Sequence, residues 1–274
     1  MVSSFLLAAI KHKNCKVQLN SFCNFHVFSW LFILSYAESS SRVVTAKIHD
    51  TLSAMIKRSL IVRRLGRVEY GAALQLQKET EAKVKNRTEE DTLFLLEHPH
   101  VFTLGRRARQ EGMMVSDELI KSLGVDVFEI NRGGKITYHG LGQIVGYPIF
   151  NLSPDREDVH KFVRDIEEVL IRTLADFEIK AFRVAGYTGV HTGQGKVAAI
   201  GVHISRWTTT HGFALNVNTD LSYFNLILAC DGEPVTSMER LLGHEIEMKK
   251  VEDRIVKHFQ EVFEMDVEQT AVSV

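Results

Sequence analysis

Apolar and polar residues alternate with two different periods along the chain, and each period predicts one type of secondary structure. Apolar positions at helical spacing predict helices over residues 70–86, 117–123, 159–177 and 251–263. Short apolar runs between turn residues predict strands over residues 92–96, 101–104, 181–184, 196–204 and 213–217. Helices and strands are mixed without regular β-α-β alternation, so we expect an α+β fold with a mixed, largely antiparallel sheet flanked by helices.

Residues 131–148 interrupt this pattern with a glycine-rich, polar stretch that contains Gly133, Gly134, Gly140 and Gly142. Glycine reaches positive φ and lets a ligand or another backbone approach closely. Apolar runs lie on both sides, so the stretch predicts a strand, an exposed glycine loop and a second strand. The loop either holds polar side chains at a strand edge as a binding site or is a turn with a solvated rim, and the stretch alone favours neither.

Charge is distributed unevenly, although the net charge is only −1. Residues 1–66 carry nine Lys or Arg and two Asp or Glu, whereas the remainder carries 24 Lys or Arg and 32 Asp or Glu. A basic, acid-poor leader is typical of an organelle transit segment, here a mitochondrial one. We therefore interpret residues 1–55 as a leader, or as an over-extended start before Met55, and residues 56–274 as the folded domain. The apolar run at residues 25–36 is shorter than the about 20 residues that a bilayer span needs, so no stable membrane insertion is expected.

The three cysteines, Cys15, Cys23 and Cys230, do not form the pattern of a disulfide framework. Two lie in the leader, so Cys230 is the only thiol of the folded domain. Its place at the end of an apolar run, before Asp231 and Gly232, indicates partial exposure, which a nucleophile needs. A free cysteine is more commonly a small buried hydrophobe, so the local sequence alone favours that role over the nucleophile. No cysteine or histidine spacing matches a zinc site, so no metal is expected.

Lys196 opens a predicted strand directly after a glycine turn at residues 193–195. Such a lysine is usually a solvated edge residue. The small residues that follow, Ala198, Ala199 and Gly201, instead predict a surface on which a ligand can lie closely. His211 and Gly212 start a similar stretch, and His139, His203 and His211 each allow a structural role. That structural role is favoured for His203, while the other two stay open.

Six segments, in this order, resemble the signature of the lipoyl(octanoyl) transferase family. They are residues 132–147, 187–190, 196–202, 211–221, Cys230 and residues 235–238. The resemblance covers about residues 65–263, and several motifs in register are far more specific than one glycine pattern. It implies a single α+β domain similar to biotin and lipoate protein ligases.

The resemblance also implies an acyltransferase that moves an octanoyl group from octanoyl-acyl carrier protein to a lysine of a lipoyl domain, the first step of protein lipoylation. The implied acceptors are the lipoyl domains of 2-oxoacid dehydrogenase E2 subunits and the glycine cleavage H protein, with no nucleic acid and no cofactor. Cys230 and Lys196 match the catalytic pair of the family, in which the cysteine forms a thioester. The residues that match positions lining the acyl pocket are Arg132, Gly133, Gly134, Lys135, Ile136, Thr137, Tyr138, His139, Ala199, Ile200, Gly201, Gly212, Phe213 and Ala214.

The chain departs from the family pattern at three places. Leu141 stands where the family usually has proline, and His191 stands where it usually has tryptophan. Ala229-Cys230-Asp231 replaces Pro-Cys-Gly, and a carboxylate beside the thiol disfavours the thiolate. The last substitution bears on the rate of the reaction more than on its class.

A thioester donor makes ATP unnecessary, which separates the transferase from two alternatives. One alternative is an ATP-dependent lipoate or biotin protein ligase, which has no need of Cys230. The other is a non-catalytic protein that binds lipoyl domains. Because acyl carrier proteins are acidic, we expect a basic docking patch at Arg106, Arg107 and Arg109, which otherwise belong to a solvated loop.

Overall fold

The computed structural model describes residues 58–108, 112–228 and 232–269. A seven-stranded mixed sheet forms the centre of this part of the chain. In spatial order its strands are β10 (Met265–Gln269), β1 (Arg58–Arg67), β2 (Asp91–Glu97), β6 (Gln143–Ile149), β9 (Thr208–Asn216), β8 (Gly195–Ser205) and β7 (Val190–Thr192). Only β1 pairs in parallel with its two neighbours, and the other four pairings are antiparallel. The predicted mixed, largely antiparallel sheet is confirmed.

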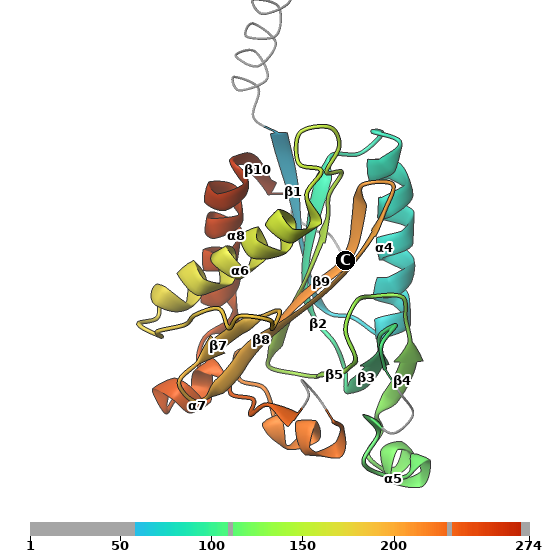
Figure 1. Ribbon diagram of the computed structural model, residues 1–274, viewed down its shortest axis with the longest axis vertical. Coiled ribbons are helices and arrows are strands. Elements are labelled where there is room, and N and C mark those ends of the chain that lie inside the picture. The colour runs from blue at the N-terminus through green and yellow to red at the C-terminus, as the bar shows by residue number, and fades with distance from the viewer. Residues whose placement is uncertain (1–57, 109–111, 229–231, 270–274) are drawn as a thin grey trace, which may run out of the picture. The chain divides into compact units, whose positions relative to one another are not determined.

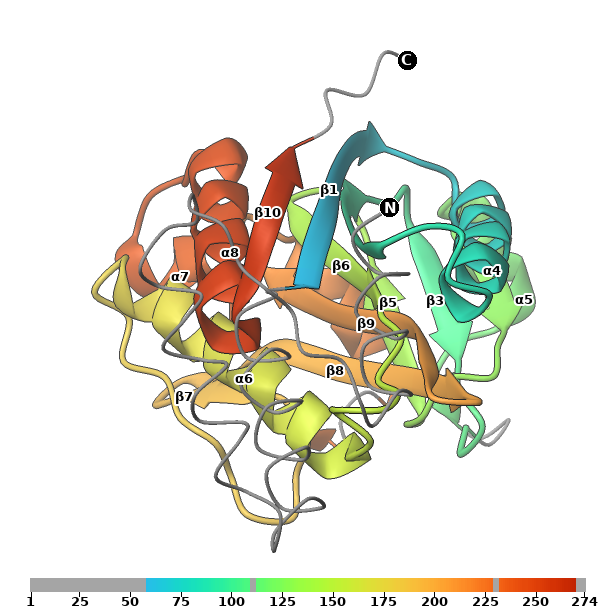
Figure 2. The same ribbon diagram turned by 90° about the horizontal axis from the view of Figure 1, so that it is seen from above.

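Helices cover both faces of this sheet (Figures 1 and 2). Helices α6 (Val159–Ala175) and α8 (Met248–Phe263) pack on one face, and α4 (Tyr70–Lys85) packs on the other. The apolar positions that predicted α6 are buried and face the sheet, because they recur every three or four residues along one side of the helix. Asp158 caps this helix by accepting a hydrogen bond from the Lys161 N–H at 2.9 Å.

A second, three-stranded sheet has the order β4 (Asp126–Glu129), β3 (Val101–Leu104), β5 (Ile136–His139). Strand β5 corrects the prediction of one exposed loop, because it is buried and pairs antiparallel with β3. Its apolar side chains Ile136 and Tyr138 pack into a small core with Phe102 and Phe224. Helix α5 (Asp117–Ser122), which Ser116 caps by accepting a hydrogen bond from the Leu119 N–H, belongs to the same part of the fold.

Other elements depart from the predicted set. Residues 181–184 form no strand, and only Phe182 makes an isolated bridge, to His191. Strands β1 and β10, the 3₁₀ helix η2 (Leu221–Leu226) and the short helix α7 (Met238–Leu242) were not predicted. Among the described residues, no helix is long and apolar enough to cross a membrane. The predicted boundary at residue 55 lies outside the described residues and stays a prediction.

Candidate active site

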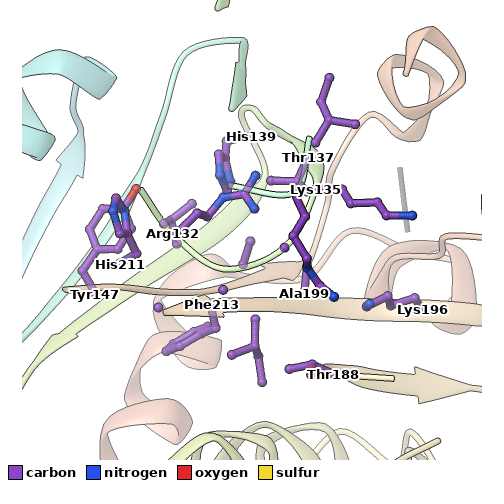
Figure 3. Close-up of a pocket in the computed structure, with 18 of the residues that line it drawn as sticks. Arg132, Lys135, Thr137, His139, Tyr147, Thr188, Lys196, Ala199, His211 and Phe213 are labelled. Atoms are coloured by element: carbon purple, nitrogen blue, oxygen red, sulfur yellow. The ribbon is translucent and has the colours of Figure 1, made fainter. Parts of the chain in front are cut away.

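A pocket of about 220 Å³ lies between strands β6, β8 and β9 of the large sheet and the glycine loop with β5 (Figure 3). Residues 132–139, 196–201 and 211–214, which are separate in the sequence, meet there. Most of the residues that match the acyl pocket of the family line it: Arg132, Gly134, Lys135, Ile136, Thr137, His139, Ala199, Ile200, Gly201, Gly212, Phe213 and Ala214. Lys196 lines the same pocket. The structure therefore brings one half of the predicted catalytic pair together with this set.

Two glycines allow the close packing that shapes the pocket. A Cβ atom on Gly201 would lie 2.9 Å from the Gly133 carbonyl oxygen and 3.1 Å from Arg132 Cδ. The glycine loop can thus lie directly on β8, where the Gly133 N–H donates to the Val202 carbonyl at 3.0 Å. Gly212 has a similar role, because a Cβ atom there would collide with the backbone of β6.

Tyr138 and Gly133 do not line the pocket, although both were predicted to. The Tyr138 hydroxyl hydrogen-bonds His100 Nδ1 at 2.8 Å, and its ring stacks on Tyr223 with centroids 4.9 Å apart. Successive side chains of a strand point to opposite faces, so Tyr138 turns away from the pocket while its neighbours Thr137 and His139 line it. The prediction treats residues 132–139 as one continuous run that lines the pocket, so it does not take this alternation into account.

Lys196 is held against the segment that follows Cys230 in the sequence. Its N–H donates to the Pro234 carbonyl at 2.8 Å, and its carbonyl accepts from the Thr236 N–H at 3.0 Å. The Lys196 side chain is 8% exposed and packs against Gly189, where a Cβ atom would lie 2.7 Å from Lys196 Cε. Cys230 itself lies outside the described residues.

The pocket is strongly cationic. Arg132 is buried, and its guanidinium donates to the Thr103 carbonyl at 2.6 Å and to the Gly133 carbonyl at 2.9 Å. The other cationic residues of the lining are Arg107, Lys135 and Lys196. The described lining contains no Asp or Glu. Burial, followed by the Arg132 charge, lowers the pKa of the neighbouring His211 to about 3, so this histidine is neutral near pH 7.

A buried histidine–tyrosine pair stands behind one end of the pocket. His98 Nδ1 lies 2.7 Å from the Val68 carbonyl oxygen, which only accepts, so this nitrogen carries the proton. His98 Nε2 lies 2.8 Å from the Tyr147 hydroxyl. Burial lowers the pKa of His98 to about 4, so the ring is neutral and Nε2 accepts from Tyr147. The lone pairs of the Tyr147 oxygen are left as acceptors.

The same reasoning fixes the tautomer of His139. Gln143 Nε2 donates to the Tyr138 carbonyl at 3.2 Å and to Asn216 Oδ1 at 2.9 Å, so Gln143 Oε1 is the acceptor. His139 Nδ1, at 2.7 Å from that oxygen, therefore carries the proton. Burial, followed by the proximity of His98, lowers the pKa of His139 to about 3. His139 Nε2 is consequently an acceptor.

Sequence reasoning did not assign eight lining residues to substrate binding. They are Tyr70, Arg107, Val145, Tyr147, Gly186, Tyr187, Thr188 and His211. Val145 and Tyr147 end the glycine motif, so strand alternation along that motif could have found them. No local signal marks Tyr70, which enters the site from the first turn of α4.

The comparisons with known proteins point to one family. Residues 69–260 match the family described as the lipoyl protein ligase A/B catalytic domain. An octanoyltransferase of Solibacter usitatus is 47% identical over 211 residues, which cover 77% of this chain and 96% of that protein. An octanoyltransferase of Caldicellulosiruptor bescii is 48% identical over 203 residues, which cover 73% of this chain and 89% of that protein. This chain belongs to the octanoyltransferase family.

Solved lipoate ligase structures share the fold. Lipoate-protein ligase A bound with ATP superimposes with a TM-score of 0.63 at 16% identity, covering 80% of this chain and 90% of that one. A putative lipoate protein ligase of T. acidophilum with bound lipoic acid gives 0.61, also at 16% identity, and covers 80% and 90%. The predicted similarity to lipoate protein ligases is therefore confirmed at the level of the fold.

In this octanoyltransferase, residues 184–188 form a loop at the edge of the pocket, which we call the lip loop. The loop supplies Gly186, Tyr187 and Thr188 to the pocket lining. Glu167 of α6 fixes both ends of the loop. Its buried carboxylate accepts from Arg183 Nε at 3.1 Å and from the Gly189 N–H at 3.0 Å. The loop between these two anchors is largely exposed.

Two of the departures from the family pattern lie in the described residues. Leu141 is exposed in the turn before β6. His191, on β7, is buried and pairs with Lys196 of β8. Its Nε2 lies 3.3 Å from Glu233 Oε2. Asp231 and Ala229, like Cys230, lie outside the described residues. Within that described part, no group of three or more His, Cys, Asp or Glu side chains is arranged to hold a metal ion.

Proposed function

We propose that this octanoyltransferase moves an octanoyl group from octanoyl-acyl carrier protein to a lysine of a lipoyl domain, through a thioester on Cys230. The observation that carries this proposal is the position of Lys196. This lysine lines the pocket and is hydrogen-bonded to Pro234, only four residues after the single thiol of the domain. Relatives at 47% and 48% identity carry the name octanoyltransferase.

The proposed reaction has two halves. Lys196, as a neutral amine, takes the proton of the Cys230 thiol, and the thiolate attacks the donor carbonyl. The thioester bond to the carrier breaks, and the carrier thiol leaves with the proton from Lys196. In the second half the acceptor lysine attacks the thioester as a neutral amine. The amide bond forms, the thioester bond breaks, and Cys230 regains its proton. Backbone N–H groups of the glycine loop are the candidates for stabilising the oxyanion.

The carrier protein is the proposed partner at the basic turn after β3. Arg106 and Arg107 are exposed there, and Arg107 also lines the pocket. Their N–H groups donate to the Arg132 and Gly134 carbonyls, both at 3.1 Å, which ties the turn to the glycine loop. Arg109 lies outside the described residues. The proposed acceptors are lipoyl domains of 2-oxoacid dehydrogenase E2 subunits and the glycine cleavage H protein.

We propose a mitochondrial location, because residues 1–55 carry five Lys or Arg and only two Asp or Glu. Fusion of residues 1–55 to a fluorescent reporter tests this directly. Co-localisation with a mitochondrial marker is expected. A reporter that stays diffuse would contradict the mitochondrial location and would leave the proposed reaction unaffected.

Intact-mass measurement tests the reaction. The full chain is incubated with octanoyl-acyl carrier protein, without ATP or acceptor, beside the Cys230→Ser variant. We expect an octanoyl adduct on the wild type that the variant lacks, and amide transfer once a lipoyl domain is added. If no adduct forms, octanoate with ATP separates the alternatives. Transfer under those conditions would identify a ligase, and its absence a protein that only binds lipoyl domains.

A further inference from the structure

The pocket has two chemically different ends (Figure 3). Lys196 and Thr188 lie at one end, and Tyr147 and His211 lie at the other. Along β8, Gly201 lies five positions after Lys196, which corresponds to about 16 Å at the rise of a β-strand. A group that reacts beside Lys196 can therefore extend along β8 towards the Tyr147 end.

Another void among the described residues also touches Lys196, but it is too small for an acyl chain. It is lined by Lys196, Gln143, Asn216 and neighbouring residues, and its volume is only about 10 Å³. That is room for one water molecule. Of these two voids, only the larger pocket can hold an acyl chain attached beside Lys196, with the far end of the chain towards Tyr147.

The Tyr147 end is not the hydrocarbon surface that a plain alkyl chain requires. The Tyr147 hydroxyl proton is committed to His98, at 2.8 Å, so its oxygen presents lone pairs. His139 lies near this end, because its ring and the Tyr147 ring are each 5.9 Å from the His98 ring. Its hydrogen bond to Gln143 uses Nδ1, so Nε2 carries a lone pair as well. Both residues line the pocket and both are buried. An apolar chain that reaches these atoms leaves two buried acceptors without a donor, which is unfavourable.

We propose that Tyr147 Oη and His139 Nε2 form a hydrogen-bond-accepting end wall, which limits alkyl chain length and admits acyl chains whose far end carries a donor such as a hydroxyl group. The inference rests on the proposed acyl transfer. It adds a class of substrate, the ω-hydroxyacyl thioesters, to the plain octanoyl group. A site built to hydrogen-bond a substrate group rejects an analogue of equal size that lacks it.

Two acyl donors with chains of equal length test the proposed end wall. Decanoyl and 9-hydroxynonanoyl chains have the same number of non-hydrogen atoms and differ only in a terminal methyl or hydroxyl group. Each is loaded on acyl carrier protein, and kcat/KM for transfer to a lipoyl domain is measured with the full chain. We expect the wild type to favour the hydroxyl chain by about tenfold, equivalent to about 1.4 kcal/mol.

Two matched variants locate the effect. Tyr147→Phe removes one acceptor and is expected to lower the preference at least threefold. Tyr187→Phe removes a hydroxyl from the exposed lip loop, and is expected to leave the preference unchanged whatever it does to the rate. Because the preference is a ratio within one protein, a loss of folded protein cancels. The wild-type ratio requires no variant, so the test survives if Tyr147→Phe does not fold.

The outcomes separate this inference from the proposed function. Efficient octanoyl transfer with a wild-type preference of one or less would overturn the end wall alone. An unchanged preference in Tyr147→Phe would do the same. Failure of the wild type to transfer any of the three acyl groups would overturn the proposed function, and the end wall with it.

Discussion

Gly189 is the position where a single added methyl group should displace Lys196. Its φ is +123°, a conformation that L side chains rarely adopt. A Cβ atom there would lie 2.5 Å from the Ala198 carbonyl oxygen and 2.7 Å from Lys196 Cε. Carbon atoms in contact prefer about 3.5–4.0 Å. In Gly189→Ala the Lys196 side chain must therefore move by about 1 Å.

Gly186→Ala is a matched control in the same loop. Gly186 also has a positive φ, +84°, but nothing lies within 4 Å of the added Cβ atom. Both variants carry a backbone strain of about 1–2 kcal/mol, which in a domain of this size lowers Tm by about 2–8 °C. Gly189→Ala also forces the Ala198 carbonyl oxygen to move, so it should be the less stable of the two. Only Gly189→Ala displaces the lysine, and a misplacement of about 1 Å in a catalytic group can reduce the rate by about 10²-fold.

Single-turnover formation of the octanoyl-enzyme, followed by mass spectrometry, measures the difference. We expect Gly186→Ala to react within about threefold of the wild type, and Gly189→Ala to react about 10²-fold more slowly. Both rates are measured well below the Tm of the less stable variant, so that loss of folded protein does not account for the gap. If Gly189→Ala reacts as fast as Gly186→Ala, the position of Lys196 is not set by Gly189 and the reasoning is wrong.

Two further predictions concern charge. Arg106→Ala with Arg107→Ala should raise KM for the carrier protein and weaken its dependence on salt, because both guanidiniums are exposed beside the pocket. Steady-state kinetics between low and high salt check this, and unchanged KM and salt dependence would remove the two arginines from the docking surface. Burial lowers the pKa of His98 from 6.5 to about 4, so the stability tied to its neutral form is present above pH 6.5 and is lost as pH falls towards 4. Urea unfolding should show that His98→Gln reduces this acid loss by up to about 3 kcal/mol, whereas equal pH dependence in both proteins would refute the assignment.

Local periodicity explains which elements could be predicted. Helices α6 and α8 each bury one apolar stripe, so their sequences carry the pattern without help from the rest of the chain. Strands β1 and β10 depend on each other and on β2, a pairing of distant segments that no local window contains. The run at residues 181–184 shows the opposite case. It is apolar enough for a strand but finds only one bridging partner, at His191.

The site, like the fold, has parts that local sequence predicts and parts that depend on contacts between distant segments. Motifs in register located the walls of the pocket, because their glycines permit close packing between the loop and β8. Motifs do not record which side of a strand a residue faces, so Tyr138 was assigned to the pocket and Tyr147 was not. The pairing of Tyr147 with His98 joins residues 49 positions apart and emerges only from the folded sheet.

The place of β1 in the large sheet has a consequence for the order in which the protein can be assembled. This strand is the earliest of the described elements, yet it is hydrogen-bonded on one side to β10, the last of them. During synthesis, one edge of β1 therefore stays open until residue 269 has left the ribosome. An open strand edge is a template for pairing with other chains. A chaperone that holds the nascent chain would protect that edge until its partner arrives.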